Sequence, residues 1–179
     1  VYRKKLLDTL ATIQSRSKSR QFFINLAVGF IPSGVLGLLL ASKIKAYLFN
    51  PISVAIALIL GAFVIFWVER PKALARQARV DEVDDMSARD ALMVGLAQCV
   101  SLVPGTSRAG ATIIGGMLAG LSRKTSTEFS FFLAIPTMVG AFGLDFWESR
   151  ELITNDVAGL IAIGFVVSFI SGLFVVRFL

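Results

Sequence analysis

Nine residues near the middle of the chain carry groups that could bind an anion, and they interrupt an otherwise apolar stretch. They are Pro104, Gly105, Thr106, Ser107, Arg108, Ala109, Gly110, Ala111 and Thr112. A charged arginine in hydrocarbon costs about 2.5–3.5 kcal/mol on insertion scales, so it requires compensation. The simplest compensation is a bound anion, to which Arg108 would offer its charge and Thr106, Ser107 and Thr112 their hydroxyl groups.

The backbone of this motif supports the same chemistry. Proline and glycine break the helix and free backbone N–H groups, here at Pro104, Gly105 and Gly110. A helix that restarts at Gly110–Thr112 would direct its first N–H groups and the positive end of its dipole at the same point. Residues 104–112 therefore predict a phosphate-binding cradle.

Composition places this cradle in a membrane. Apolar residues make up 55% of the chain and charged residues 17%, and the mean hydropathy is +0.75. Soluble domains contain about 25% charged residues. The formal charge of +6 therefore indicates orientation across a bilayer rather than nucleic-acid binding. The single cysteine, Cys99, cannot form an internal disulfide.

The hydrophobic pattern predicts an all-α integral membrane protein, a polytopic helical bundle forming a single membrane domain over residues 1–179. Stretches of about 20 apolar residues cross a 30 Å hydrocarbon core. The predicted spans are 22–41, 52–68, 129–147 and 157–176. Residues 1–20 are basic and amphipathic, which predicts a cytosolic flank at the membrane surface, with lipid recognition as the alternative.

A hydrophilic loop over residues 70–90 contains four carboxylates, on Asp81, Glu82, Asp84 and Asp85. They could hold a divalent cation, but the glycine of a calcium-binding loop is missing. A solvated loop that leads to a helix N-cap at Ser87 is the preferred interpretation.

The apolar arms on either side of the motif, residues 91–103 and 111–121, are each too short to cross a bilayer. They form either one kinked span or a re-entrant hairpin over residues 91–121. The hairpin places 14 basic residues on one side of the membrane and 3 on the other, whereas a single crossing gives 12 and 5. The positive-inside rule favours the hairpin. Gly116 and Gly120 have a spacing that permits close helix packing.

The run EVDDMSARDALMVGLAQCVSLVPGTSRAGATIIGGMLAGLSRKTSTEFSFFLAIPTMVGA closely resembles the second half of bacterial undecaprenyl-diphosphate phosphatases, the bacitracin-resistance family. The stretch GFIPSGVLGLLLASKIKAYLFNP is similar to that family too. The resemblance implies an inverted-repeat fold, of which this chain is the second part, with a re-entrant helix pair in each repeat. It also implies a hydrolase of the bacterial inner membrane that removes one phosphate from undecaprenyl diphosphate and so recycles the cell-wall lipid carrier.

The family's diphosphate-binding serine, arginine and threonine match Ser107, Arg108 and Thr112. The expected catalytic residues are Arg108 and Ser107, and the expected substrate-binding residues are Gly105, Thr106, Ser107, Arg108, Gly110 and Thr112. Ala109 stands where the family commonly has a further serine. The family's glutamate-rich first motif, which supplies a carboxylate and a histidine, is absent, as is its last span. We therefore expect a fragment that is inactive on its own.

Several further expectations concern ligands and partners. A divalent cation, Mg²⁺ or Ca²⁺, suits a diphosphate, although the chain offers no evident ligands for it. The expected partners are a polyprenyl diphosphate and membrane lipids, no nucleic acid is expected, and a homodimer is left open. The alternative function is a transporter or flippase of polyprenyl phosphate or another anion, because carriers also bind anions at broken helices.

Overall fold

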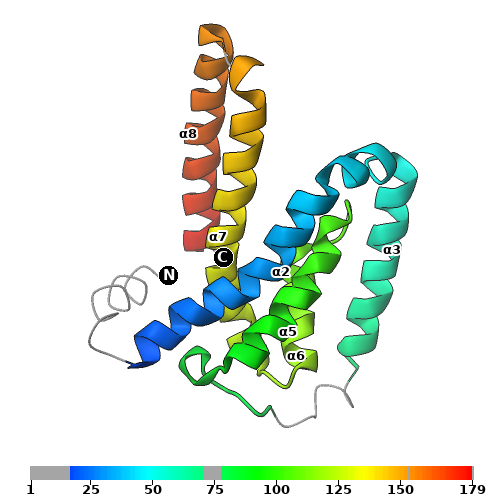
Figure 1. Ribbon diagram of the computed structural model, residues 1–179, viewed down its shortest axis with the longest axis vertical. Coiled ribbons are helices and arrows are strands. Elements are labelled where there is room, and N and C mark those ends of the chain that lie inside the picture. The colour runs from blue at the N-terminus through cyan, green and yellow to red at the C-terminus, as the bar shows by residue number, and fades with distance from the viewer. Residues whose placement is uncertain (1–16, 71–77, 153, 179) are drawn as a thin grey trace. The chain divides into compact units, whose positions relative to one another are not determined.

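The computed structural model describes residues 17–70, 78–152 and 154–178, and these residues are almost entirely helical (Figure 1). The helices are α2 (Ser17–Tyr47), α3 (Pro51–Val68), η1 (Val83–Asp85), α5 (Ala88–Gln98), η2 (Cys99–Leu102), α6 (Arg108–Leu118), α7 (Arg123–Ser149), η3 (Arg150–Leu152) and α8 (Asn155–Phe178). They belong to two compact units, Val1–Met138 and Val139–Leu179. Most of the predicted flank at residues 1–20 lies outside the described residues.

Four of the helices, α2, α3, α7 and α8, are long and apolar enough to cross a membrane. Each of the four predicted spans lies within one of them, and the prediction of an all-α integral membrane protein is confirmed. With 31 residues, α2 is about 46 Å long, which exceeds the hydrocarbon thickness. It continues through Pro32 as one helix.

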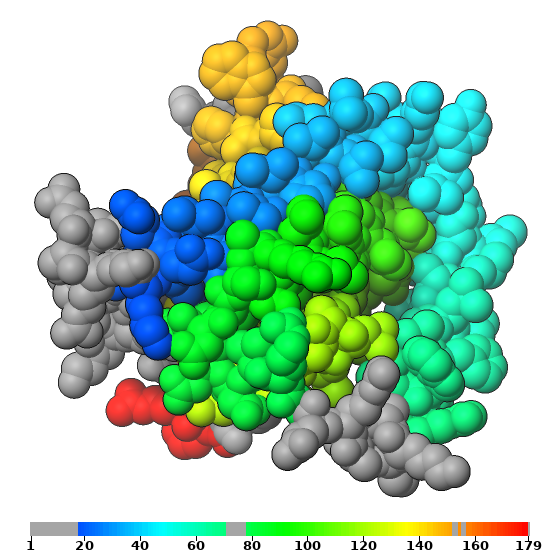
Figure 2. Space-filling view, turned by 60° about the horizontal axis from the view of Figure 1, so that its bottom comes forward, coloured from blue at the N-terminus to red at the C-terminus, as the bar shows by residue number. Residues whose placement is uncertain are grey.

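The buried core of the first unit lies where α2, α5 and α7 meet the loop that precedes α5. Phe22 and Phe132 pack edge to face there, with 5.0 Å between ring centroids. The loop contributes Val83 and Met86, which are buried in the same cluster. The side-chain amide of Asn25 donates to the carbonyl of Met86 at 2.8 Å, which fixes the loop against α2. Figure 2 shows this loop and α5 in green against the blue start of α2.

Small residues allow α5 to approach both of its neighbours closely. A Cβ on Gly95 would lie 2.3 Å from the carbonyl oxygen of Gly29 in α2. A Cβ on Gly115 of α6 would lie 2.2 Å from the Cβ of Ala97. Both helix crossings therefore require glycine at these positions.

The structure divides the roles of the two glycines predicted to pack together. Gly116 does pack closely, since a Cβ there would lie 2.6 Å from the Oγ of Ser126 on α7. Gly120, in contrast, has a φ of +93° and forms the turn that ends α6. The prediction of close helix packing from the four-residue spacing therefore holds for Gly116 but not for Gly120.

The helices α5 and α6 form a hairpin whose two outer ends are held together. Ser87 is the N-cap of α5, as predicted, and forms a capping box with Asp90. The guanidinium of Arg79 donates both to the carboxylate of Asp90 and to the carbonyl of Ala119, which joins the start of α5 to the end of α6. That this hairpin enters the membrane and returns stays a prediction.

The α5–α6 hairpin lies beside α3. At one end Glu69 forms an ion pair with Arg123, just after the hairpin. Near the other end, Gly105 in the hairpin tip lies against the backbone of Val54. Glu69 and Val54 are about 22 Å apart along a helix, so the hairpin extends along most of α3.

The second unit consists of the end of α7, η3 and α8, and it contains the predicted span 157–176. The apolar side chains that the structure describes in this unit are exposed, including those of Phe165, Phe169 and Val176. Such a surface suits lipid rather than water. At the turn, the guanidinium of Arg150 lies 4.5 Å from the ring centre of Trp147, a pairing typical of the interfacial region.

Candidate functional site

The tip of the hairpin contains a turn that only glycine can form. Gly105 has a φ of +94°, a conformation that costs other residues about 1–2 kcal/mol. In addition, a Cβ at this position would lie 2.6 Å from the carbonyl oxygen of Val54 in α3. The turn closes with a hydrogen bond from the amide of Thr106 to the carbonyl of Val103 at 3.1 Å. The tip is therefore tightly turned and seated directly on α3.

Ser107 is the N-cap of α6 rather than an unengaged donor. Its hydroxyl oxygen accepts a hydrogen bond from the amide of Gly110 at 3.1 Å. The helix consequently starts at Arg108, earlier than the predicted restart at residues 110–112, because this cap satisfies one of the first amides. The amides of Ser107, Arg108 and Ala109 have no acceptor within the helix. They form the positive end of the α6 dipole.

Arg108 is half-buried and rests on α7. One of its guanidinium nitrogens donates to the carbonyl of Ser130 at 3.4 Å, a long bond that leaves most of the five N–H donors for a ligand. The side chain is therefore supported by α7 from one side, and Arg108 is itself the first residue of α6. This arrangement suits an anion that is bound by the guanidinium and the helix N-terminus together.

Thr112 is placed differently from the other predicted residues. It is completely buried, and its hydroxyl lies 2.6 Å from the hydroxyl of Ser130. The same hydroxyl also bonds the carbonyls of Arg108 and Ala109 at 3.0 and 3.1 Å. These contacts tie α6 to α7 and occupy the group that was expected to donate to phosphate.

Ser130 was missed by the analysis of the sequence as a residue of the site. Its carbonyl accepts from Arg108 and its hydroxyl contacts Thr112, so one residue of α7 supports two residues of the motif. The signal was present in the run TEFSF, which was used for the resemblance but assigned no role. The contact joins residues 18 and 22 positions apart, which no local pattern indicates.

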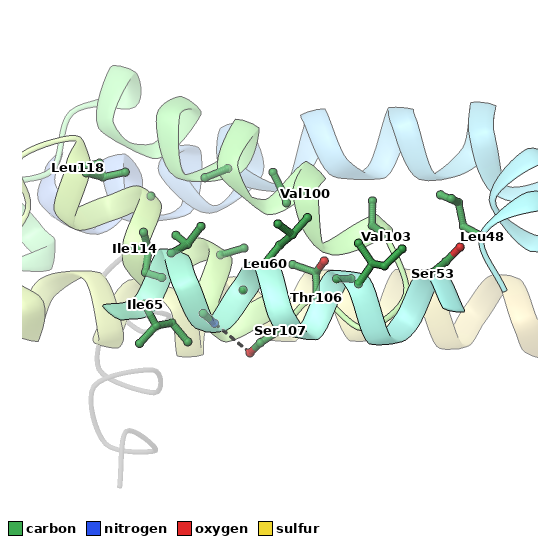
Figure 3. A pocket seen from close by; sticks show the side chains of 18 residues that line it. Leu48, Ser53, Leu60, Ile65, Val100, Val103, Thr106, Ser107, Ile114 and Leu118 are labelled. Atoms are coloured by element: carbon green, nitrogen blue, oxygen red, sulfur yellow. Dashed lines mark hydrogen bonds between the residues drawn. The ribbon is translucent and has the colours of Figure 1, made fainter. Parts of the chain in front are cut away.

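An apolar groove of about 610 Å³ lies between α3 and the hairpin (Figure 3). Leu60 and Ile65 line it from α3, and Val100 and Ile114 line it from the hairpin. The hydroxyl-bearing residues Thr106 and Ser107 border the same groove. Pockets of this size that are mostly apolar, with a few polar groups, are typical of small-molecule sites. The groove thus joins a hydrocarbon surface to the start of α6.

Metal ligands do not gather in the part of the chain that the structure describes. No three of its histidine, cysteine, aspartate and glutamate side chains come together in a metal-binding arrangement. Of the four loop carboxylates considered above, Asp85 instead pairs with Lys18 at 2.8 Å. The described residues therefore offer no ligand set for a divalent cation.

Known proteins resemble the chain along its whole length. The family described as bacitracin resistance protein BacA matches residues 1–179. Undecaprenyl-diphosphatase 2 of Rhodospirillum rubrum is 53% identical over 176 residues, which are 98% of this chain and 63% of that protein. The undecaprenyl-diphosphatase of Acidovorax ebreus is 50% identical over 179 residues, which are 100% of this chain and 65% of that protein.

The undecaprenyl-diphosphatase of Pseudomonas fluorescens is similar to the same extent, with 48% identity over 98% of this chain and 63% of its own length. The chain thus spans slightly less than two thirds of each of these relatives. The matched region contains the whole hairpin, α3 and the supporting part of α7.

Proposed function

Because the chain belongs to the bacitracin resistance protein BacA family, we propose that it forms the phosphate-binding part of a membrane phosphatase. The substrate would be undecaprenyl diphosphate, which its relatives' names indicate, and the products undecaprenyl phosphate and inorganic phosphate. The observation that carries this proposal is the start of α6, where three amides have no acceptor within the helix, Arg108 is the first residue, and Thr106 and Ser107 border an apolar groove. A lipid diphosphate needs an anion-binding surface for its diphosphate next to an apolar surface for its hydrocarbon chain.

Each residue of the motif has a proposed role. The planar guanidinium of Arg108 would bind two phosphate oxygens and neutralise the charge that develops as the bond to the bridging oxygen breaks. Ser107 and the first amides of α6 would donate to the same phosphoryl group, and Thr106 would donate from the groove side. Gly110 would let the backbone approach the ligand, and Gly105 would expose the tip backbone to it by turning the tip against α3. Thr112 would act indirectly, through its contact with Ser130.

Hydrolysis also requires a group that activates water. The chain contains no histidine, the commonest general base, and Ser107 is engaged as a helix cap. We therefore propose Ser107 as a donor rather than a nucleophile, and we predict that residues 1–179 alone release no phosphate. A divalent cation and a homodimer remain proposals, tested by chelation and by light scattering of the detergent-solubilised protein.

The groove gives the lipid part of the substrate a place. Most of its lining is apolar, and its polar border is formed by Thr106 and Ser107 of the motif together with Ser53 of α3. The isoprene units nearest the diphosphate would lie in the groove while the remaining chain extends into the bilayer. A flippase of polyprenyl phosphate would need the same two surfaces, so binding alone does not distinguish the two functions.

The deciding experiment measures phosphate release from undecaprenyl diphosphate by the natural protein, purified in detergent. By natural protein we mean the protein at the length at which its cell makes it, as distinct from residues 1–179 alone. We expect turnover, and we expect Arg108→Lys to lower kcat/KM about 10²-fold, as loss of a preorganised donor does. Lysine keeps the charge but cannot reproduce the planar pair of donors. The midpoint of thermal unfolding should not change, because the bond to Ser130 is long.

Two matched variants complete this test. Ser107→Ala and Thr112→Ala should each lower activity less than Arg108→Lys, because each removes a hydroxyl and leaves the charge in place. Full activity of Arg108→Lys would show that Arg108 acts only as a diffuse charge. Substrate binding without any phosphate release by the natural protein would favour the flippase.

A further inference from the structure

One buried side-chain amide joins three helices immediately before the motif. Gln98 is the last residue of α5, and none of its surface is exposed. Its side-chain nitrogen donates to the hydroxyl of Ser33 on α2 and, at 3.3 Å, to the hydroxyl of Thr137 on α7. A single amide group therefore connects α2, α5 and α7.

Both hydroxyl partners follow a proline inside a membrane helix. The sequences are Ile31-Pro32-Ser33 in α2 and Ile135-Pro136-Thr137 in α7. The hydroxyl of Ser33 donates to the carbonyl of Phe30 at 3.1 Å, and that of Thr137 donates to the carbonyl of Leu133 at 2.6 Å. With their protons used in this way, the two oxygens can only accept. The two N–H bonds of one amide match them, which fixes the orientation of the Gln98 side chain.

The oxygen of the Gln98 amide indicates that this side chain is not the one that would stabilise the folded state most. Its oxygen, Oε1, is buried and has no hydrogen-bond partner among the described residues. An apolar side chain of similar size would avoid the penalty of an unpaired buried acceptor. What glutamine adds is a pair of directed bonds to two neighbouring helices.

These bonds lie on the face of α7 that also supports the motif. Thr137 and Ser130 are seven residues apart, which is two helical turns, so they lie on one face about 10 Å apart. Ser130 contacts Arg108 and Thr112, which follow the turn at the tip. Thr137 contacts Gln98, which precedes η2 and that turn. Both ends of the segment 98–112 are therefore attached to the same face of α7.

We propose that Gln98 is a positioning residue for the phosphate-binding motif. By binding Thr137 while Ser130 binds Arg108, it sets the distance between the two ends of the tip. The free amides of α6 and the guanidinium are thereby held in one arrangement. This inference relies on the proposed function only for its activity measurement.

The test replaces Gln98 in the natural protein with a residue of the same shape whose donors depend on protonation. Gln98→Glu has no N–H donor, and its ionised carboxylate cannot donate to Ser33 or Thr137. When protonated it donates one hydrogen bond, and burial favours the protonated form. We expect kcat/KM, relative to the natural protein at the same pH, to be about tenfold lower or more at pH 8 and to recover as the pH falls toward 6. Gln98→Leu should lose activity equally at every pH.

A second measurement does not depend on phosphatase activity. In a Cys99→Ala background, Thr106→Cys reports the exposure of the tip through its rate of reaction with a maleimide. We expect Gln98→Leu to change this rate severalfold, because the segment 98–112 loses one of its two attachments to α7. The control is Gln21→Leu, since the side chain of Gln21 bonds Asn25 within α2, at 2.9 Å and away from the motif, and no other described residue. It should leave both the activity and the labelling rate unchanged.

The outcomes separate this inference from the proposed function. An unchanged labelling rate together with an activity loss that does not recover at low pH in Gln98→Glu would overturn the inference, because Gln98 would then be an ordinary core residue. If the natural protein releases no phosphate, the proposed function fails, and the labelling rate alone decides the role of Gln98. If neither Gln98 variant folds, Thr137→Val decides instead: it keeps the shape, removes one acceptor, and should change the labelling rate in the same direction.

Discussion

The two ends of the α5–α6 hairpin use polar groups in opposite ways. The base comprises residues 78–90 and 119–123, and its polar groups are paired with one another. The carboxylate of Asp90 accepts from the amide of Ser87 at 3.0 Å, from its hydroxyl at 2.7 Å and from Arg79. Backbone bonds complete the base, from Arg79 to the carbonyl of Gly120 at 2.7 Å and from Ser122 to that of Val80 at 2.9 Å.

The tip comprises residues 103–109, and several of its hydrogen-bond donors have no partner among the described residues. Three amides at the start of α6 have no intrahelical partner, and Arg108 makes only one long bond. The only left-handed residue of the tip, Gly105, is pressed against α3. The comparison teaches that the base holds the hairpin together, whereas the tip keeps a glycine turn and unpaired donors, which suit an anion-binding site.

The largest expected effect concerns the membrane topology of the hairpin, on which the contrast between base and tip depends. If the hairpin is re-entrant, cysteines introduced at Arg89 and Lys124, on either side of it, will react with a membrane-impermeant maleimide from the same face. A cysteine in place of Lys43, near the end of α2, should react from the opposite face, since α2 crosses the membrane between them. The measurement is labelling of intact cells and inverted vesicles in a Cys99→Ala background. Labelling at 89 and 124 from opposite faces would exclude the hairpin.

The next largest effect should come from the tip itself. In Gly105→Ala, the new Cβ would require a left-handed backbone and would lie 2.6 Å from the carbonyl oxygen of Val54. We expect phosphate release by the natural protein to fall at least about 10²-fold, because the donors move away from the ligand. The midpoint of thermal unfolding should fall by only a few degrees, since the base is untouched.

The control for this substitution is Gly164→Ala in α8, where the added Cβ would have no atom within 4 Å beyond its chain neighbours and the adjacent helix backbone. It should leave both the activity and the thermal midpoint unchanged or raise the latter slightly. An active Gly105→Ala protein would mean that the shape of the tip does not matter for turnover.

The features that were predicted correctly from the sequence depend on local patterns. The four apolar spans, the N-cap at Ser87 and the break around Pro104 and Gly105 follow from runs of residues that are adjacent in the chain. What it did not predict depends on contacts between distant segments. The carbonyl and hydroxyl of Ser130 meet the motif, and Gln98 meets two helices, over separations of 18 to 65 residues.

One local expectation also needed the structure for its correction. The start of α6 was expected at residues 110–112, but the cap formed by Ser107 moves it to Arg108. Thr112 was expected to bind the ligand, which stays a prediction; in the structure its hydroxyl contacts that of Ser130 on α7.

The smallest expected effect on phosphate release comes from a substitution in the base of the hairpin. Asp90→Asn removes the charge that Arg79 and Ser87 bind, and we expect it to lower the free energy of unfolding by about 1–3 kcal/mol near neutral pH. Phosphate release per folded molecule should hardly change, because the tip is attached separately to α3 and α7. The control is Asp81→Asn in the exposed part of the same loop, which should change stability by no more than about 0.5 kcal/mol.

The pH dependence of Asp90→Asn identifies the cause of the loss. Burial raises the pKa of the Asp90 carboxyl, but the hydrogen bonds from Ser87 and Arg79 outweigh burial and hold that pKa below its ordinary value of 3.8. A carboxyl whose pKa is lower in the folded state stabilises the fold above the unfolded-state pKa and loses that contribution as the pH falls through the folded-state pKa. The difference in thermal midpoint between the natural protein and Asp90→Asn should therefore be constant from pH 5 to 8. Below pH 4 it should shrink, whereas a difference that persisted there would mean that the packing of Asp90, rather than its charge, holds the base together.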